Sequence, residues 1–283
     1  MATVGRRGLA SRVVTGLRQQ TRQPDRIIIC VPDPKEFLSP SGGATCEVII
    51  GRRGLALQRN AIIESITGND LLVFIDDDFI MADDFLAELE RLFTENLEVV
   101  MATGTVLFDG IKGPGIDYDA AMRLLRAAPP PRPEPLVDVF NAYGCNMICR
   151  AAPVIEHGLR FDDNLPLYAW LEDVDFSRKL APYGRIVRSP RLRGVHLGAK
   201  TARTGGKRLG YSQIANPLYL MRREAVSPAW AIERLGQNFV SNLVNSVRPE
   251  DWIDRRGRLH GNLIAFGDLL SGKLHPQNAL RLE

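Results

Sequence analysis

The sequence predicts an α/β protein in which a mostly parallel sheet is covered by helices on both faces. Helical and strand-like patterns alternate through the first 105 residues, and the strand-like runs are apolar almost throughout. Strands of a parallel sheet are buried on both faces, so they read as continuous apolar runs. A third observation places function on this sheet: three carboxylates directly follow one strand, at the end where ligands bind in such sheets.

The expected elements of the first half follow from spacing and from glycine or proline breaks. Residues 8–20 place apolar side chains at helical spacing, and the β-branched run 27–31 ends at Pro32. The next expected elements are a strand at 47–50, a helix at 55–66, a strand at 71–75, a helix from about 85 and a strand at 99–104.

The second half is less regular. Glycines and prolines interrupt residues 109–136 around one short helix, which predicts an excursion beside the sheet rather than a domain linker. Strand character returns at 137–149 and 185–188, a helix is expected at 172–180, and the last sixty residues are helical with proline breaks.

Composition excludes several classes of protein. The 283-residue chain is 45% hydrophobic and 24% charged, as in ordinary globular proteins, and its net charge of +3 gives no argument for nucleic-acid binding. No apolar run approaches the roughly 20 residues that span a bilayer, and the N-terminus lacks the apolar region of a secretory signal. The four cysteines lack C-x-x-C spacing, so we expect reduced thiols and no zinc site. These observations predict a cytoplasmic protein.

The carboxylates are Asp76, Asp77 and Asp78, directly after the run LLVFI. They repel one another, and burying them is unfavourable without a positive partner. Carboxylates at a strand end suit Mg²⁺ or Mn²⁺, which also bind substrate phosphates. In an extended chain Asp76 and Asp78 point to the same side and can share one ion, while Asp77 faces elsewhere. The alternative is a solvated turn in which Asp77 or Asp78 caps the segment that follows.

Two later features are ambiguous when taken alone. Glu172, Asp173 and Asp175 lie in the first turn of an expected helix, where acidic residues commonly complement the helix dipole. His196 follows an arginine-rich strand, and a single histidine is more often a satisfied polar residue than a ligand. The order of these features along the chain is more specific than any one of them.

That order resembles the family 2 glycosyltransferases, which are inverting, nucleotide-sugar-dependent enzymes with the GT-A fold. The resemblance covers roughly residues 1–225 and is carried by five segments in sequence. They are ATVGR, RRGLALQRNAII, LLVFIDDDFIMADDFLAEL, GCNMICRAAPVIEHGLRFDDNL and WLEDVDFSRKLAPYGRIV. It implies a Rossmann-like sheet in a catalytic domain over 1–225, with a nucleotide-binding half to about 105 and an acceptor half after it. Residues 226–283 would form a helical C-terminal extension.

The resemblance also implies roles for individual residues. Asp76 and Asp78 would hold Mn²⁺ or Mg²⁺ against the donor diphosphate, and His196 would lie near that diphosphate or complete the metal shell. Asp173 would be the general base that deprotonates the acceptor hydroxyl, which implies inversion at the anomeric carbon. The nucleotide-binding residues would be Thr3, Asp33, Arg53, Asn60 and Asp77. The donor-sugar and acceptor residues would be Gly144, Asn146, Trp170 and Glu172.

Substrates follow from the resemblance only as classes. The donor would be a nucleoside-diphosphate sugar, with UDP favoured over GDP and dTDP. The acceptor would be a glycan or a lipid-linked sugar for cell-surface polysaccharide. Peripheral contact of the helical tail with the inner face of the membrane is compatible with this reading.

Two departures from the family pattern bear on these expectations. Many family members carry an Asp-Asp-Gly-Ser type stretch after the second strand, where an Asp reads the base. Here that stretch is VPDP, so only Asp33 is available, which leaves the nucleotide open. The chain also begins almost inside the first expected strand, so either that strand is very short or the natural start lies upstream. Two rival functions remain: a haloacid-dehalogenase-type phosphatase, which also places D-x-D after a strand, and a catalytically silent relative that binds nucleotide sugar or glycan.

Overall fold

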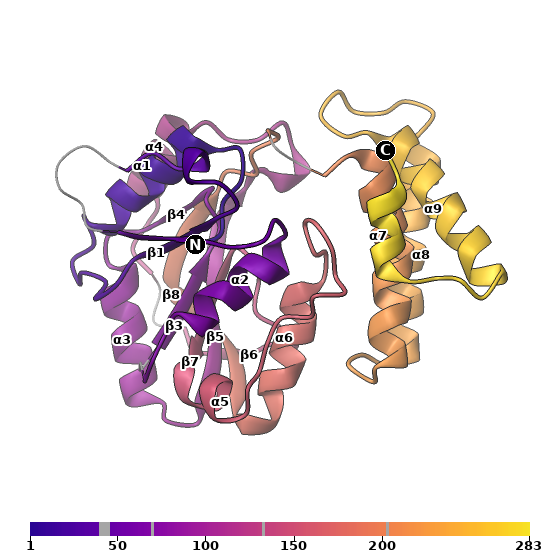
Figure 1. The fold of residues 1–283 in the computed structure, drawn as a ribbon. Helices are drawn as coiled ribbons and strands as arrows, with labels where there is room; N and C mark the ends of the chain where they lie inside the picture. The colour runs from indigo at the N-terminus through magenta and orange to yellow at the C-terminus, as the bar shows by residue number, and fades with distance from the viewer. Residues whose placement is uncertain (40–45, 69–70, 132–133, 202–203) are drawn as a thin grey trace. The chain divides into compact units, whose positions relative to one another are not determined.

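The computed structural model describes residues 1–39, 46–68, 71–131, 134–201 and 204–283 (Figure 1). They form two compact units. The first comprises Met1–Arg53, Leu57–Arg160 and Lys179–Ala202, and the second comprises Gly54–Ala56, Phe161–Arg178 and Arg203–Glu283.

Strands and helices alternate along the chain. The strands are β1 (Ile28–Val31), β2 (Glu47–Ile50), β3 (Leu71–Ile75), β4 (Phe79–Met81), β5 (Val99–Asp109), β6 (Val137–Asp138), β7 (Asn146–Arg150) and β8 (Arg185–His196). The α-helices are α1 (Arg7–Leu17), α2 (Leu55–Glu64), α3 (Phe85–Glu95), α4 (Tyr118–Ala127), α5 (Ala151–Glu156), α6 (Glu172–Leu180), α7 (Gly206–Arg222), α8 (Pro228–Asn245) and α9 (Arg255–Leu270). Short 3₁₀ segments are η1 (Pro34–Glu36), η2 (Gly110–Lys112), η3 (Ala181–Tyr183) and η4 (Pro276–Arg281). The elements expected from the sequence are confirmed, although β5 and β8 extend further than predicted. The expected strand at 137–149 is instead two strands, β6 and β7.

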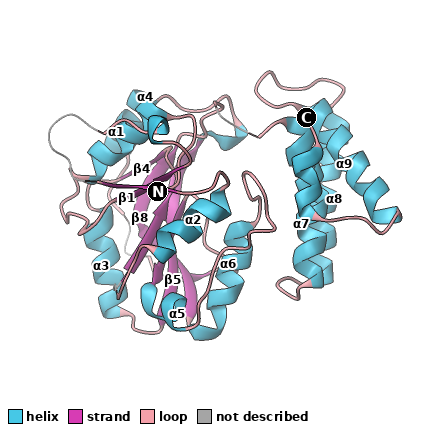
Figure 2. Ribbon diagram, in the orientation of Figure 1, coloured by secondary structure: helices cyan, strands magenta, loops and turns pink. Residues whose placement is uncertain are grey.

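The centre of the first unit is a six-stranded sheet with the order β3-β7-β5-β8-β4, in which β6 pairs with β8 outside this path. A separate two-stranded sheet joins β1 and β2, and Ala2 bridges to Cys30 beside it. Helices flank the strands (Figure 2). α1 and α3 contribute Val13, Val14, Leu89 and Phe93 to the main apolar cluster, together with strand residues.

The expectation of a mostly parallel sheet is wrong in its pairings. Among the described ladders, β1–β2 and β5–β8 are parallel, whereas β7 runs antiparallel to both β3 and β5. β4 and β6 are antiparallel to β8. β7 is buried along almost its whole length, and a buried antiparallel strand is as continuously apolar as a parallel one. The apolar pattern therefore reports burial, not strand direction.

The chain turns where the sequence suggested an extended strand end. Asp77 and Asp78 lie in a turn between β3 and β4, and Phe79 N donates to Asp76 O at 3.2 Å. β4 then pairs with the end of β8, where Phe79 is opposite His196. The turn therefore brings the aspartates beside His196, 120 residues further along the chain.

The second unit contains three packed helices, α7, α8 and α9. A Cβ at Gly210 would lie 2.0 Å from Arg258 O, and one at Gly261 would lie 2.0 Å from Lys207 O, so the backbones of α7 and α9 are in contact. The sequence placed α7 within the catalytic domain, whereas here it packs with the helical tail. No helix within the described ranges is long and apolar enough to cross a membrane.

Candidate metal centre

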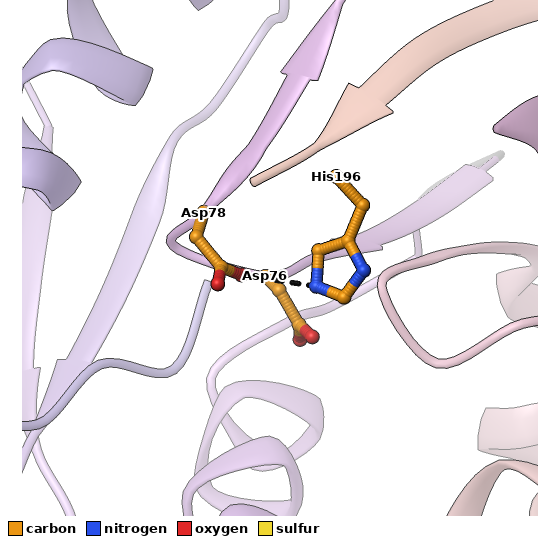
Figure 3. A group of neighbouring side chains, drawn as sticks. All are labelled: Asp76, Asp78 and His196. Carbon is orange, nitrogen blue, oxygen red and sulfur yellow. Dashed lines mark ion pairs between the residues drawn. The ribbon is translucent and has the colours of Figure 1, made fainter. Parts of the chain in front are cut away.

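Three potential ligand side chains meet at the β3–β4 turn and the end of β8. Asp76, Asp78 and His196 each offer one ligand atom, and these atoms all lie within 4.8 Å of one another. Figure 3 shows the two carboxylates and the imidazole turned toward one another. Asp78 and His196 are buried, and Asp76 is partly exposed. The geometry therefore brings together the three residues that the sequence assigned to a metal.

His196 is held in one orientation by its neighbours. Its Nδ1 lies 2.9 Å from Asp109 Oδ1, and its Nε2 lies 3.4 Å from Asp78 Oδ1. The Asp109 carboxylate is fixed in turn by the Tyr143 hydroxyl, which donates at 3.0 Å, and by Ile111 N at 3.0 Å. Burial opposes protonation of His196, but the hydrogen bonds to Asp109 and Asp78 outweigh it and raise the pKa of His196 to about 10. These hydrogen bonds therefore favour the protonated, cationic imidazole at neutral pH.

Asp78 is the most strongly stabilised carboxylate of the triplet. Its Oδ2 accepts from Ala199 N at 2.9 Å and lies 3.2 Å from Arg6 NH1. Burial alone would raise the pKa of Asp78, but the hydrogen bond and charge of His196, together with Arg6, hold it below its usual value. Asp78 is therefore ionised and able to bind a cation.

The other two aspartates have arginine partners. Arg59 is almost fully buried, and its NH2 donates to Asp76 Oδ1 at 3.0 Å and to Gly144 O at 2.8 Å. Asp77 accepts from Thr3 Oγ1 at 2.5 Å and from Arg6 NH1 at 2.8 Å. Burial raises the pKa of Asp76 above its usual value against the charge of Arg59, and it raises the pKa of Asp77 to about 6 against that of Arg6.

These contacts explain how the carboxylate triplet is tolerated. Three negative side chains are balanced by Arg6, Arg59 and protonated His196, so the site contains its own cations. Two carboxylates suit Mg²⁺ and Mn²⁺ alike, and the imidazole nitrogen favours a transition-metal ion such as Mn²⁺. The Asp109–His196 contact adds the carboxylate–histidine arrangement that orients metal-binding imidazoles. The donor set fits a divalent cation.

The residues expected to contact the nucleotide are in different environments. Thr3 and Asn60 are buried, and the Thr3 hydroxyl is committed to Asp77. Asp33 is exposed and caps η1 by accepting from Lys35 N at 2.8 Å. Arg53 is an exposed side chain 3.5 Å from Glu36.

The two residues expected at the donor sugar also differ. Gly144 contributes the carbonyl that anchors Arg59. Asn146 is fully buried, and its Oδ1 accepts from Thr103 Oγ1 and Gly104 N, both at 2.6 Å. The Asn146 side chain therefore joins β7 to β5, and a sugar contact through this side chain conflicts with its full burial.

The remaining predicted residues, Trp170, Glu172 and Asp173, belong to the second unit. Glu172 and Asp173 begin α6, and Glu172 is buried while Asp173 is partly exposed. The backbone before them is unusual, because Leu167, Ala169 and Leu171 have positive φ angles of 60°, 50° and 74°. Asn216 Nδ2 of α7 donates to Trp170 O at 2.7 Å and fixes this segment. Left-handed non-glycine residues are unfavourable and concentrate at functional sites.

Sequence reasoning missed three residues of this centre: Arg6, Arg59 and Asp109. Arg59 stands next to predicted Asn60 in RRGLALQRNAII, but the motif predicts a nucleotide contact for Arg53, which lies two residues after Gly51. Arg6 ends ATVGR, and Asp109 is the last residue of β5. No signal in the sequence identifies Asp109, because the expected strand ends at residue 104 whereas β5 continues to Asp109. Nothing in the local sequence distinguishes the buried Arg59 and the partly buried Arg6 from the exposed arginines.

Comparison with known proteins identifies the fold. No protein-family model matches the chain, and no curated protein matches its sequence. Solved structures do match. The mannosyltransferase PcManGT from Pyrobaculum calidifontis, in complex with GDP-Man and Mn²⁺, has a TM-score of 0.52 at 14% identity, covering 95% of this chain and 78% of that one. S. aureus TarS 1–349 in complex with UDP-GlcNAc has a TM-score of 0.56 at 12% identity, covering 94% and 79%.

A third solved structure is GalNAc-T7 with UDP, GalNAc and Mn²⁺, which has a TM-score of 0.53 at 14% identity and covers 94% of this chain and 56% of that one. These matching structures are GT-A-type glycosyltransferases. Identities this low establish the fold alone, so the predicted α/β GT-A fold class, a central sheet flanked by helices, is confirmed.

Proposed function

We propose that this protein is a metal-dependent glycosyltransferase that moves a sugar from a nucleoside-diphosphate sugar to an acceptor hydroxyl. The observation that carries the proposal is the cluster of Asp76, Asp78 and His196, whose ligand atoms lie within 4.8 Å of one another at the end of β3 on a GT-A fold. The same cluster argues against a phosphatase nucleophile, because Asp76 is engaged by Arg59 and shares its surroundings with two other potential ligands.

In this proposal Asp76, Asp78 and His196 hold Mn²⁺ or Mg²⁺. When bound, the ion supplies Lewis-acid stabilisation of the charge that develops on the departing diphosphate. Asp109 positions the imidazole through Nδ1, which directs Nε2 toward Asp78. Arg6 keeps Asp78 in place and joins it to the segment after β8, because its guanidinium also donates to Ala199 O at 3.2 Å and to Thr201 O at 3.1 Å.

The general base is assigned to Asp173 on the strength of the motif WLEDVDFSRKL. A single base that activates the acceptor hydroxyl for direct displacement gives inversion at the anomeric carbon, as in family 2. The backbone that precedes α6, with its three left-handed residues, supports a functional role for this segment. Trp170 and Glu172 are proposed to contact the sugar or the acceptor.

The substrates are proposed as classes. The solved structures that resemble this chain were obtained with UDP, UDP-GlcNAc or GDP-Man, which supports a nucleoside-diphosphate sugar with UDP favoured. The sequence resemblance also suggests the class of acceptor, which we propose to be a glycan or a lipid-linked sugar. The product would be a polysaccharide made at the inner face of the membrane.

The first experiment is thermal unfolding with UDP, GDP and dTDP, each with and without Mn²⁺. A ligand that binds only the native state at about a hundredfold excess over Kd stabilises it by about 2.7 kcal/mol. We expect stabilisation by one nucleotide that requires Mn²⁺ and is lost in Asp78→Ala. The matched control is Asp83→Ala, an exposed aspartate close by in sequence that should retain the shift. Absence of any shift in the unsubstituted protein would contradict the proposal.

The base is tested separately by Asp173→Asn. The variant should keep the metal-dependent nucleotide shift and lose about 10²–10⁴-fold in sugar transfer, followed as donor hydrolysis where no acceptor is supplied. An unsubstituted protein that binds nucleotide but neither transfers nor hydrolyses the donor would be the catalytically silent relative.

A further inference from the structure

The segment that leads into α6, residues 162–171, has a backbone that its own residues do not favour. Leu167, Ala169 and Leu171 have positive φ angles, and none of them is glycine. Residues with a Cβ are strained in this region and persist only where their surroundings hold them. The segment should therefore be held by contacts from outside it, one of which is Leu55 N, which donates to Leu167 O at 2.9 Å.

Helix α7 holds this segment at both ends. Asn216 Nδ2 donates to Trp170 O at 2.7 Å, and the Tyr219 hydroxyl donates to Asp162 Oδ2 at 2.9 Å. Asn216 and Tyr219 are three residues apart, which places them on one side of the helix. The strained residues lie between these two attachment points or directly after the second, so α7 restrains the part of the segment that needs it.

The amide group of Asn216 is explained by this contact and not by the stability of the helices. The residue is fully buried, and its Oδ1 has no hydrogen-bond partner among the residues that the structure describes. A buried acceptor without a partner is unfavourable, and an apolar side chain of similar shape would avoid that loss. What the amide adds is the hydrogen bond from Nδ2 to Trp170 O.

The start of α6 packs against the same helix. Val174 lies in one apolar cluster with Leu220 of α7 and Ala231 of α8. Asp173 therefore stands between Trp170 and Val174, two residues whose positions depend on α7. The helical part of the second unit thus determines where the Asp173 carboxylate lies.

We propose that Asn216 is a positioning residue for the reaction: by holding Trp170 O, it keeps Asp173 where this base can accept the proton of the acceptor hydroxyl. The inference rests on the proposed function, in which Asp173 is the general base. A small displacement of a base lowers the rate steeply, because proton transfer requires hydrogen-bond distance. Tyr219 supports the same segment from its other end.

The first test measures the segment itself. In Asn216→Leu, the amides of Ala169 and Glu172, which donate to Pro166 O and Ala169 O at 2.8 Å, should exchange hydrogen about tenfold faster, as expected when one hydrogen bond is lost. Amide exchange in α9 should not change. The thermal midpoint should stay close to that of the unsubstituted protein, because the unsatisfied Oδ1 is removed together with the hydrogen bond.

Tyr219→Phe tests the other end without disturbing the ring. It removes the hydroxyl that contacts Asp162 and should accelerate exchange in the same segment severalfold, so a readout exists even where Asn216→Leu does not fold. Unchanged exchange in the segment for both variants would overturn the proposal.

The matched control is Asn262→Leu. Asn262 is also fully buried and donates to a backbone carbonyl, Gly210 O, at 2.6 Å, but its Oδ1 accepts from Asn242. The substitution should lower the thermal midpoint and leave exchange in residues 162–171 unchanged at temperatures well below it. Equal acceleration of the segment by Asn262→Leu and Asn216→Leu would show that the segment follows general stability, which would overturn the proposal.

The second test measures the reaction as donor hydrolysis with UDP-GlcNAc and GDP-Man in Mn²⁺. Asn216→Leu should lower kcat by about 10–100-fold and change the donor KM by less than about twofold, because it displaces the base and leaves the metal ligands in place. A segment that exchanges faster with an unchanged kcat would overturn the positioning role. Failure of the proposed function would be seen separately, as an unsubstituted protein that hydrolyses neither donor, and hydrogen exchange would still show whether Asn216 holds the segment.

Discussion

His196 Nδ1 lies 2.9 Å from Asp109 Oδ1, and this contact leaves Nε2 of the same ring facing Asp78. The two residues end neighbouring parallel strands, β5 and β8, which pair Asp109 directly with His196. The sheet register therefore fixes both the position of the imidazole and the nitrogen that it presents to a cation.

Asp109→Asn should weaken Mn²⁺ binding by about 10–100-fold while leaving the fold intact. The amide keeps the shape of the carboxylate but removes the charge that orients the imidazole and raises its basicity. Isothermal titration with Mn²⁺ in the presence of the bound nucleotide measures the effect. Asp138→Asn, which alters an exposed aspartate paired with Arg185, is the control and should bind Mn²⁺ as the unsubstituted protein does. Equal Mn²⁺ affinities for the unsubstituted protein and both variants would show that Asp109 does not support metal binding.

Metal-free stability should fall as pH rises from about 7 toward 10. The folded pKa of His196 is about 10, against an ordinary value of 6.5. Protonation therefore favours the folded state, and this contribution is complete below pH 6.5 and is lost as pH rises through about 10. Thermal midpoints measured in chelator should show the decline, and His196→Gln should reduce it. Because a bound metal replaces the proton, Mn²⁺ affinity should rise over the same interval. A pH-independent midpoint in both proteins would contradict the charged imidazole.

Arg59→Met should destabilise the metal-free protein by about 3 kcal/mol, because it leaves Asp76 without its buried cation. Adding Asp76→Asn should recover part of this loss, since the uncompensated charge is then removed. Urea unfolding gives both values. Arg53→Met is the matched control, because this arginine is 64% exposed and its salt bridge to Glu36 should contribute less than about 1 kcal/mol. A loss of similar size for Arg53→Met would show that charge near the site, not the buried pair, controls stability.

Two glycines of α9 should respond oppositely to alanine. Gly261→Ala should destabilise by about 1–3 kcal/mol, because its Cβ would lie 2.0 Å from Lys207 O and force α7 and α9 apart. Gly267→Ala should stabilise by up to about 1 kcal/mol, because nothing lies within 4 Å of its Cβ and alanine favours the helix. Urea unfolding followed by far-ultraviolet circular dichroism compares them. Stability changes of the same sign in the two variants would contradict the close packing of α7 against α9.

Local patterns predicted the elements of the fold more accurately than their arrangement. The apolar run of β3 and the helical spacing of α1 and α3 are properties of adjacent residues, so both could be read from the sequence. Strand direction could not, because buried β7 is equally apolar whichever way it runs. The helical period of α7 likewise gave no sign that it packs with α9, which depends on Gly210 and Gly261 lying opposite one another.

For the candidate site as well, the sequence predicts some residues correctly but not their arrangement. Asp76 and Asp78 were predicted because carboxylates after an apolar strand need an unusual environment, and His196 was added from the resemblance to a known family. The expected extended geometry was wrong: a turn at Asp77 and Asp78 brings the ligand atoms together. The sequence predicts a role for Arg53 and none for the buried Arg59, because the exposure of a side chain cannot be read from residue type.

The sequence by itself determined which side chains could form a cation site, since that depends on residue type and on the strand that precedes them. Only the tertiary structure decided which charges compensate one another. Arg6, Arg59 and Asp109 come from three separate segments, and pairing energy depends on distance and burial that no local pattern contains. The fold brings these segments together, so it decides the charge balance of the centre.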